Sequence, residues 1–210
     1  MTCHGLPTDD SIARPQLEVA TTVSTPASST ALLVVDMQRD FVYPDGALHV
    51  EAASETVQPI AELITLARAH AIPVVYTRDT HTEDDREFDI WPRHCIQGTE
   101  GHQIIDELAP QPDDLIVDKN RYDAFYGTPL DHHLSHVRNI ETLLIVGTVA
   151  NICVGQTAAS AGLRWYRVIT PADCLSALTP FDQASALRQI DSLYNGTVVA
   201  DASAIQFERN

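Results

Sequence analysis

Short apolar runs alternate with segments of helical periodicity along most of the chain, and this alternation restricts the possible folds more than any other feature of the sequence. Six such runs occur: ALLVVD, IPVVYTR, DLIVDK, TLLIVG, YRVITPAD and GTVVADASAI. Short runs of this kind are typical of parallel strands that are buried on both faces. The alternation predicts a single α/β domain of three layers (α/β/α), with a doubly wound, mostly parallel six-stranded sheet.

The segments between these runs predict the helices. In residues 52–70, apolar side chains recur at the three- and four-residue spacing of a helix with one buried face. Further helices are expected over residues 101–108, 129–138, 152–164 and 181–193. Helices between parallel strands cover both faces of the sheet, as the three-layer fold requires.

The first 29 residues differ in composition from the rest of the chain. They are rich in Ser, Thr, Pro and Ala, and no helical or strand period is sustained in them. We expect residues 1–29 to form a flexible or surface-draped extension, with an arm that packs on a neighbouring subunit as the alternative. Residues 30–210 are expected to form the α/β domain, since a chain of 210 residues suits one domain with a sizeable core.

Charge and cysteine content limit the partners and the location. The formal net charge of −16 repels phosphate groups, so neither nucleic acid nor an anionic membrane is expected as a partner. No apolar stretch reaches the ~18 residues of a membrane-spanning helix, and the start MTCHGLPTDD lacks the features of a secretory signal. The four cysteines are widely spaced without a CxxC pair, which favours a reducing compartment. We expect a cytoplasmic protein.

Four reactive side chains come at or just after the ends of predicted strands. Asp36, Asp79, Lys119 and Cys153 follow the first, second, third and fourth apolar run, respectively. In an open parallel sheet, ligands bind beyond the carboxyl ends of the strands. We therefore expect these four side chains to share one edge of the sheet.

Three of these side chains suit acyl transfer. A thiol with a pKa of ~8.5 is mostly protonated at neutral pH, and a helix N-terminus and the ammonium of Lys119 both favour the thiolate of Cys153. Asp36 can accept the thiol proton and later deliver it to a leaving amine. The turn TVAN before the cysteine can direct backbone N–H groups at a developing oxyanion. These residues predict cleavage of an amide or ester through a thioester, and the alternative is a cysteine that only fills the core.

A second polar group lies in the long connection over residues 78–101. It contains Asp79 and His81 two residues apart, with His94 and Glu87 further along. Carboxylate and imidazole ligands suit zinc, iron or manganese, so a divalent metal site is predicted. The alternative is a hydrogen-bonded Asp–His pair with His94 packed under a tryptophan.

The remaining histidines and cysteines are assigned structural roles. His132, His133 and His136 lie on one predicted helix without an acidic partner, which favours a solvated or interface helix over a second metal site. Cys95 and Cys174 have no local base or cation in the sequence, so both are expected to be structural. The fourth cysteine lies in the extension and is expected to be exposed.

Five stretches of the chain resemble the isochorismatase-like cysteine hydrolases. They are LLVVDMQRDF with PDGAL, YTRDTH, WPRHCIQGTEG, DKNRYDAFYGTPL and GTVANICVGQTAASA, in that order. The resemblance implies that Asp36, Lys119 and Cys153 form a catalytic triad. It also implies a cis peptide bond before Val149, with the backbone N–H groups of Val149 and Cys153 as the oxyanion hole. Because relatives with this cysteine are amidases, it implies amide cleavage rather than vinyl-ether cleavage.

Within this family, the chain looks most like the nicotinamidases. Asp79, His81 and His94 carry that likeness, which implies a metal that binds the pyridine nitrogen of the substrate, directly or through its water shell. Phe41 and Trp91 match the aromatic residues that flank the substrate ring in that branch.

The chain also departs from the nicotinamidase pattern. Where that pattern has a third loop histidine, this chain has Glu87, which is the fourth candidate metal ligand besides Asp79, His81 and His94. The usual Thr-Asp pair before the nucleophile is Ala150-Asn151, and the segment between His81 and Trp91 is short. These departures leave the identity of the amide open.

The sequence thus predicts a cysteine amidohydrolase that converts a small primary amide to an acid and ammonia through a thioester, with nicotinamide as the first choice. N-carbamoyl, ureido and maleamate-type amides are alternative substrates. A non-catalytic metabolite-binding protein on the same fold is the alternative of a different class. The resemblance further implies a homodimer or homotetramer.

Overall fold

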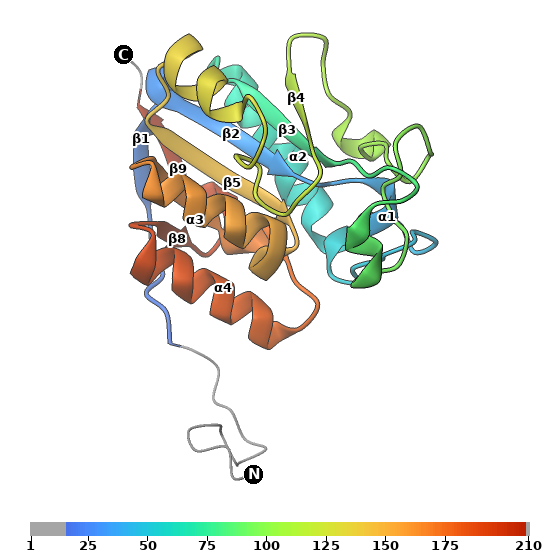
Figure 1. The fold of residues 1–210 in the computed structure, drawn as a ribbon. Helices are drawn as coiled ribbons and strands as arrows, with labels where there is room; N and C mark the ends of the chain where they lie inside the picture. The colour runs from blue at the N-terminus through green and yellow to red at the C-terminus, as the bar shows by residue number, and fades with distance from the viewer. Residues whose placement is uncertain (1–15, 209–210) are drawn as a thin grey trace.

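The computed structural model describes residues 16–208, which form a central sheet with helices on both faces (Figure 1). In these residues the sheet has seven strands, and six of them follow the order β4-β3-β2-β5-β6-β8. The six are β2 (Thr30–Val35), β3 (Val74–Asp79), β4 (Leu115–Lys119), β5 (Thr142–Thr148), β6 (Arg167–Pro171) and β8 (Thr197–Val199). The two-residue β7 (Leu175–Ser176) pairs with the end of β5. All pairs in this sheet are parallel, so the predicted doubly wound sheet is confirmed.

The path of the chain through the sheet determines where a site can form. Strands β2 and β5 lie side by side at its centre, and every residue of both is buried. From β2 the chain builds one half of the sheet through β3 to β4, returns to the centre at β5, and builds the other half through β6 to β8. The two central strands are covered on both faces, which explains why their sequences are apolar throughout. The reversal between β2 and β5 is the point at which open α/β sheets bind ligands.

The long helices divide between the two faces of the sheet. Helix α2 (Ala53–Ala69) covers one face, while α3 (Gly155–Leu163) and α4 (Pro180–Leu193) cover the other (Figure 1). The short α1 (Arg39–Val42) follows β2. In α2, Ile60, Leu63, Ile64 and Ala67 are buried against the sheet, as the helical periodicity predicts. Among the described residues, no helix is long and apolar enough to cross a membrane.

Two expected helices take other forms. Residues 101–108 contain a single 3-10 turn, Asp106–Leu108, because their backbone instead pairs with the segment after β2: Gln38 bridges Ile104, and Ile105 N–H donates to the Met37 carbonyl. Within residues 129–138 the helix is a π-helix over His132–Val137. Residues 101–108 do not form the expected helix because they pair with backbone that is distant in the sequence. Local periodicity carries no information about such pairing.

The last apolar segment forms two strands rather than one. Strand β8 ends at Val199, and β9 (Ile205–Glu208) pairs in parallel with β1 (Val23–Pro26) as a separate two-stranded sheet. Within the expected extension 1–29, the described part therefore contains a paired strand. Residues 1–15 lie outside the described part, including the cysteine expected to be exposed.

Candidate active site

The end of β2, the end of β4 and the turn after β5 bring a carboxylate, an ammonium and a thiol together. Lys119 Nζ lies 2.7 Å from Asp36 Oδ2 and 3.6 Å from Cys153 Sγ. All three residues are buried. The sequence places them at three strand ends, and the sheet order brings these ends together at the switch point.

A threonine that the sequence analysis missed fixes the carboxylate. Thr77 Oγ1 donates to Asp36 Oδ1 at 2.5 Å and accepts from the Asp36 backbone N–H at 3.2 Å. Asp36 has a left-handed backbone, with φ of 50°, where a non-glycine residue is uncommon. With Oδ1 held by the threonine, Oδ2 points to Lys119. The available signal was that Thr77 lies two residues before Asp79 in β3, on the same face of the strand.

Burial determines the charges of these groups as much as their mutual attraction does. Burial by itself lowers the pKa of Lys119, but Asp36 and Asp79 hold it well above its usual value, so the side chain is an ammonium. Burial raises the pKa of Asp36, and Lys119 offsets only part of this rise.

The nucleophile candidate differs from the expected thiolate. Burial raises the pKa of the Cys153 thiol well above its usual value; Lys119 opposes the rise, while Asp36 and Asp79 add to it. The resting group is therefore a thiol. Burial is the main cause, and Lys119 does not offset it because Asp36 and Asp79 also act on the sulfur.

The turn before the cysteine has the backbone that the resemblance implies. The peptide bond between Thr148 and Val149 is cis. A π-helical turn over Ala150–Val154 follows it, contains Cys153 and leads directly into α3. At the end of β5, Gly147 has φ of 117°, and a Cβ there would lie 2.1 Å from the Val35 carbonyl oxygen. Only glycine allows the end of β5 to approach β2 this closely.

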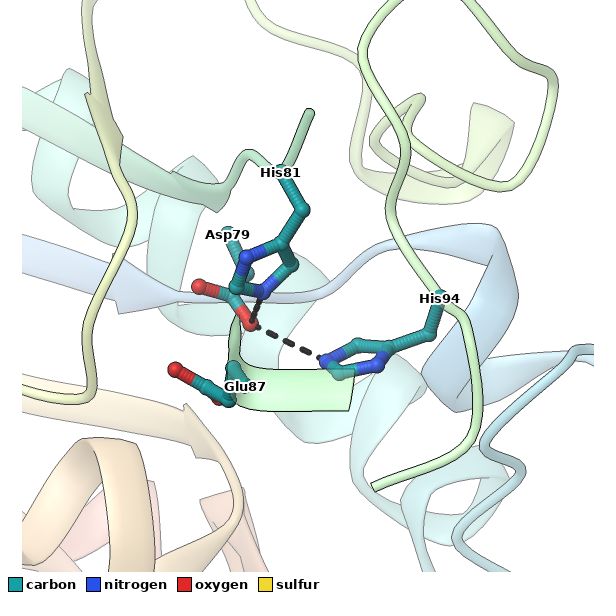
Figure 2. A group of neighbouring side chains, drawn as sticks. All are labelled: Asp79, His81, Glu87 and His94. Carbon is teal, nitrogen blue, oxygen red and sulfur yellow. Dashed lines mark hydrogen bonds and ion pairs between the residues drawn. The ribbon is translucent and has the colours of Figure 1, made fainter. Parts of the chain in front are cut away.

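The loop candidates also come together. The ligand atoms of Asp79, His81, Glu87 and His94 all lie within 4.8 Å of one another, and all four side chains are buried. Asp79 Oδ2 lies 3.1 Å from His81 Nε2 and 3.3 Å from His94 Nε2, and the Glu87 carboxylate lies beside this group (Figure 2). Two imidazoles and two carboxylates are a donor set that zinc, iron and manganese all accept.

Asp79 belongs to both groups. Its Oδ1 accepts from Lys119 Nζ at 3.1 Å, and its Oδ2 faces the two histidines. Burial opposes ionisation of this carboxyl, yet Lys119, His81 and His94 hold the pKa of Asp79 below its usual range. Burial lowers the pKa of His81, but Asp79 and Asp85 raise it to about 9. The triad candidates and the metal candidates thus share one carboxylate.

A glutamine in the stretch DMQRDF holds this shared residue. Gln38 Nε2 donates to the Asp79 carbonyl at 2.9 Å, and its Oε1 accepts from the Asp79 backbone N–H at 2.7 Å. Two residues further on, Asp40 takes no part in the triad. Its Oδ2 accepts from the Cys95 N–H at 2.7 Å and so ties the residue next to His94 to the segment after β2.

An apolar pocket opens onto both groups. Phe41 and Trp91, the two aromatic residues expected in the wall, line it together with Leu48, Val50, Tyr122, Val149, Ile152 and Leu178. The polar part of its lining consists of Cys153, Asp79, Glu87 and His94. Tyr122 was missed by the sequence analysis; its hydroxyl accepts from Trp91 Nε1 at 2.9 Å and fixes the indole.

None of the residues assigned structural roles is part of the lining of this pocket. Cys95 and Cys174 are fully buried, free cysteines. On the π-helix, His132 and His136 are exposed with ring centroids 5.6 Å apart, whereas Leu134 is buried. The exposed histidines agree with a solvated or interface helix.

Residues 30–203 match the isochorismatase domain model. The ureidoacrylate amidohydrolase RutB of Methylorubrum extorquens is 31% identical over 207 residues, covering 86% of this chain and 82% of that protein. The crystal structure of N-carbamoylsarcosine amidase from Thermoplasma acidophilum is 37% identical with a TM-score of 0.74, covering 81% of this chain and 95% of that one.

A metal-bearing relative has a similar fold. The pyrazinamidase of Pyrococcus horikoshii, solved in complex with zinc, is 30% identical with a TM-score of 0.76. The alignment covers 81% of this chain and 98% of that structure. The match over residues 30–203 spans the whole central sheet and both groups of polar residues. This chain belongs to the isochorismatase domain family.

Proposed function

We propose that this chain is a cysteine amidohydrolase that cleaves a small primary amide to an acid and ammonia. The observation that carries the proposal is the buried contact of Lys119 with both Asp36 and Cys153 at the switch point of the sheet. A thiol, a carboxylate and an ammonium at hydrogen-bonding distance supply a nucleophile, a base and a fixed positive charge. Relatives whose names describe amide hydrolysis, at 31% and 37% identity, support the same reaction class.

The reaction proceeds in two halves. Cys153 Sγ attacks the amide carbonyl while its proton passes to Asp36, and the Val149 and Cys153 N–H groups stabilise the oxyanion. Asp36 returns that proton to the leaving nitrogen, the C–N bond breaks, and ammonia leaves a thioester. Asp36 then takes a proton from water, whose oxygen attacks the thioester. The C–S bond breaks, the acid is released, and Asp36 returns the proton to the sulfur to restore the thiol. Lys119 stays protonated throughout and stabilises the negative charge on its two partners.

Asp79, His81, Glu87 and His94 would hold a divalent metal, namely zinc, iron or manganese. Their fit rests on the donor set itself: four buried ligand atoms within 4.8 Å of one another, two from imidazoles and two from carboxylates. A bound metal would supply a Lewis acid that can bind a heteroaromatic nitrogen of the substrate, directly or through the water shell of the metal. The chain's own contribution is to orient the amide, because the pocket places these ligands and Cys153 around one cavity.

The pocket favours an uncharged aromatic amide, and nicotinamide is our first choice. Its lining is apolar and aromatic apart from Asp79, Glu87, His94 and Cys153, and none of the lining residues is Lys or Arg. The nearby Lys119 is paired with Asp36 and Asp79, and Arg121 is paired with Asp85. A substrate carboxylate would therefore find no Lys or Arg partner among the lining residues.

Ureido and N-carbamoyl acids are the second candidate class. The likeness to RutB and to N-carbamoylsarcosine amidase supports them. A maleamate-type amide also carries a carboxylate, so it belongs to the same charged class. The absence of Lys and Arg from the pocket lining separates this class from nicotinamide.

The test is ammonia release from nicotinamide, ureidoacrylate, N-carbamoylsarcosine and maleamate, with and without prior removal of metal by a chelator. We expect nicotinamide to be the best substrate, with turnover that falls on metal removal and returns with zinc, iron or manganese. Cys153→Ala is expected to abolish turnover while the thermal unfolding temperature stays near that of the wild type. An active Cys153→Ala protein would overturn the mechanism, and a preference for a charged amide would overturn the substrate.

A metabolite-binding protein without catalysis is the remaining alternative. The rate of Cys153 alkylation by iodoacetamide, measured together with amide turnover, distinguishes it, because an adjacent base activates a nucleophile. If Cys153 is alkylated no faster than a free cysteine and no amide is turned over, the binding protein is the better description.

A further inference from the structure

A carboxylate that the proposed mechanism does not use lies directly behind the metal candidates. Asp85 precedes the 3-10 turn Arg86–Asp89, and its side chain is only 8% exposed. Its Oδ2 lies 3.0 Å from His81 Nδ1, and its Oδ1 accepts from the Glu87 backbone N–H at 2.9 Å. Asp85 therefore contacts two of the four candidate ligands.

The contact with the imidazole determines which ring nitrogen is free. With a carboxylate at His81 Nδ1, the proton of the neutral ring lies on Nδ1, and Nε2 presents its lone pair to the cluster beside Asp79. Without that carboxylate, both tautomers and other ring orientations become accessible. A carboxylate behind a metal-binding histidine also increases the basicity of the ligand nitrogen.

The second contact fixes a second ligand. By accepting from the Glu87 N–H, Asp85 begins the turn that carries this glutamate, so its side chain caps the turn in the way a helix N-cap does. The same carboxylate thus sets the orientation of one ligand side chain and the backbone position of another.

An arginine holds this carboxylate in place. Arg121 Nη1 lies 3.1 Å from both carboxylate oxygens of Asp85 and 3.7 Å from Glu87 Oε2. The arginine follows β4, whereas the other two residues belong to the connection between β3 and β4. The ion pair therefore ties the loop of the metal candidates to the segment that follows β4 at the edge of the sheet.

We propose that Asp85, held by Arg121, is a positioning residue that sets the affinity of the Asp79, His81, Glu87 and His94 cluster for a divalent metal. This inference rests on the metal site of the proposed function. Its ligand is a transition metal ion such as Zn²⁺.

The test measures the Zn²⁺ dissociation constant of metal-stripped protein by competition with a chromophoric chelator. Asp85→Ala is expected to weaken binding about 10- to 100-fold, as loss of the partner of a metal-binding histidine does in other proteins. Asp85→Asn keeps an oxygen that can accept one of the two N–H groups, so an intermediate loss is expected. The matched control is Asp84→Ala, an exposed carboxylate one residue away that contacts only Thr82 among the hydrogen bonds of this loop, and its affinity should stay within about twofold of wild type.

Arg121→Ala provides a variant with little risk to the fold, because its side chain is 43% exposed. A several-fold loss of Zn²⁺ affinity is expected, smaller than that of Asp85→Ala. Thermal unfolding of the metal-free variants is the second readout: a purely structural role would lower the unfolding temperature and leave the dissociation constant unchanged.

The outcomes separate this inference from the proposed function. If the wild type binds Zn²⁺ and both Asp85 variants bind it with unchanged affinity, the positioning role is wrong while the metal site stands. If the wild type itself binds no Zn²⁺, the metal site and this role both fail. Ammonia release from an amide by the same preparation would still support the triad.

Discussion

At the scale of single residues, the site depends on groups that hold the reactive ones. Thr77, Gln38 and Asp85 form hydrogen bonds to Asp36, Asp79 and His81, respectively. None of these three residues takes part in the proposed reaction itself, so the sequence gives no sign of their role. Their effect is to give each reactive side chain one orientation inside a buried site, where an unpaired polar atom is costly.

Thr77→Val tests this positioning. Valine has nearly the same shape but no hydroxyl, so Asp36 loses the partner of Oδ1 and of its backbone N–H. A hydrogen bond to a charged group contributes about 1.5–3 kcal/mol, so we expect kcat to fall about 10- to 100-fold with a smaller change in KM. Steady-state kinetics check this, with Thr77→Ser as the variant that restores activity and the exposed Thr65→Val as the control. Unchanged kcat in Thr77→Val would show that Lys119 alone orients Asp36.

The pH dependence of the metal-free protein tests the environment of His81. Its pKa is raised to about 9 in the folded protein, against about 6.5 in an unfolded chain. A raised pKa stabilises the folded state fully below pH ~6.5, and this stabilisation is lost as the pH rises to about 9. At about 1.4 kcal/mol per pKa unit, the loss is on the order of 3 kcal/mol.

Urea unfolding of metal-stripped protein between pH 6 and 9.5 measures this loss. His81→Asn should be less stable than wild type at pH 6 and nearly equal to it at pH 9.5. The exposed His136→Asn should differ little from wild type at either pH. A constant difference between wild type and His81→Asn across the range would contradict the raised pKa.

At the scale of elements, the approach of β5 to β2 fixes the geometry of the site. Gly147 at the end of β5 pairs with Val35, and the residue that follows Val35 is Asp36. The cis peptide and the turn with Cys153 follow β5 immediately. Any displacement between these two strands therefore moves the carboxylate and the thiol relative to each other.

Gly147→Ala tests this approach, with Gly127→Ala as a matched control. Both glycines have positive φ, 117° and 70°, but a Cβ at Gly147 would lie 2.1 Å from a backbone oxygen, whereas one at Gly127 meets nothing within 4 Å. Gly127→Ala should cost about 1 kcal/mol in the free energy of unfolding. Gly147→Ala should cost several times more and reduce turnover at least tenfold, because backbone atoms must move. Equal effects of the two substitutions in urea unfolding and kinetics would refute the role of close packing.

At the scale of the whole molecule, the two ends of the described chain pair with each other. Strand β1 pairs with β9, Val23 and Thr25 are buried, and Arg167 donates to the Ser24 carbonyl at 2.9 Å. Figure 1 shows this small sheet beside the beginning of β2, whereas Asp36, Lys119 and Cys153 lie at or after the carboxyl ends of their strands. It therefore contributes to stability without contact with the reacting groups.

Removal of residues 1–26 tests that separation. The deletion exposes the edge of β9 and removes the buried Val23, whose burial contributes about 2 kcal/mol. The free energy of unfolding in urea should fall by at least that amount, while kcat of the remaining folded protein stays within about twofold of wild type. The contrary outcome is loss of kcat without loss of stability, which would indicate an active role for this segment. A shorter deletion, of residues 1–15 alone, keeps β1 and serves as the control.

The sequence by itself determined the order of the strands in the chain, the buried character of the central ones, and the positions of Asp36, Lys119 and Cys153 at strand ends. Local patterns suffice there, because a strand covered on both faces must be apolar and must end where polar groups begin. The same patterns could not show that residues 101–108 pair with the chain after β2, or that the last apolar segment divides between two sheets.

Only the tertiary structure determined which side chains orient the reactive groups and how charge is distributed among those groups. Burial raises the pKa of the Cys153 thiol, and Asp36 and Asp79 add to this rise while Lys119 opposes it. Lys119 contacts both carboxylates because β2, β3 and β4 lie side by side. The contact of Asp85 with Arg121 likewise joins segments 36 residues apart. Such contacts depend on the sheet order and on burial, and both are properties of the folded chain.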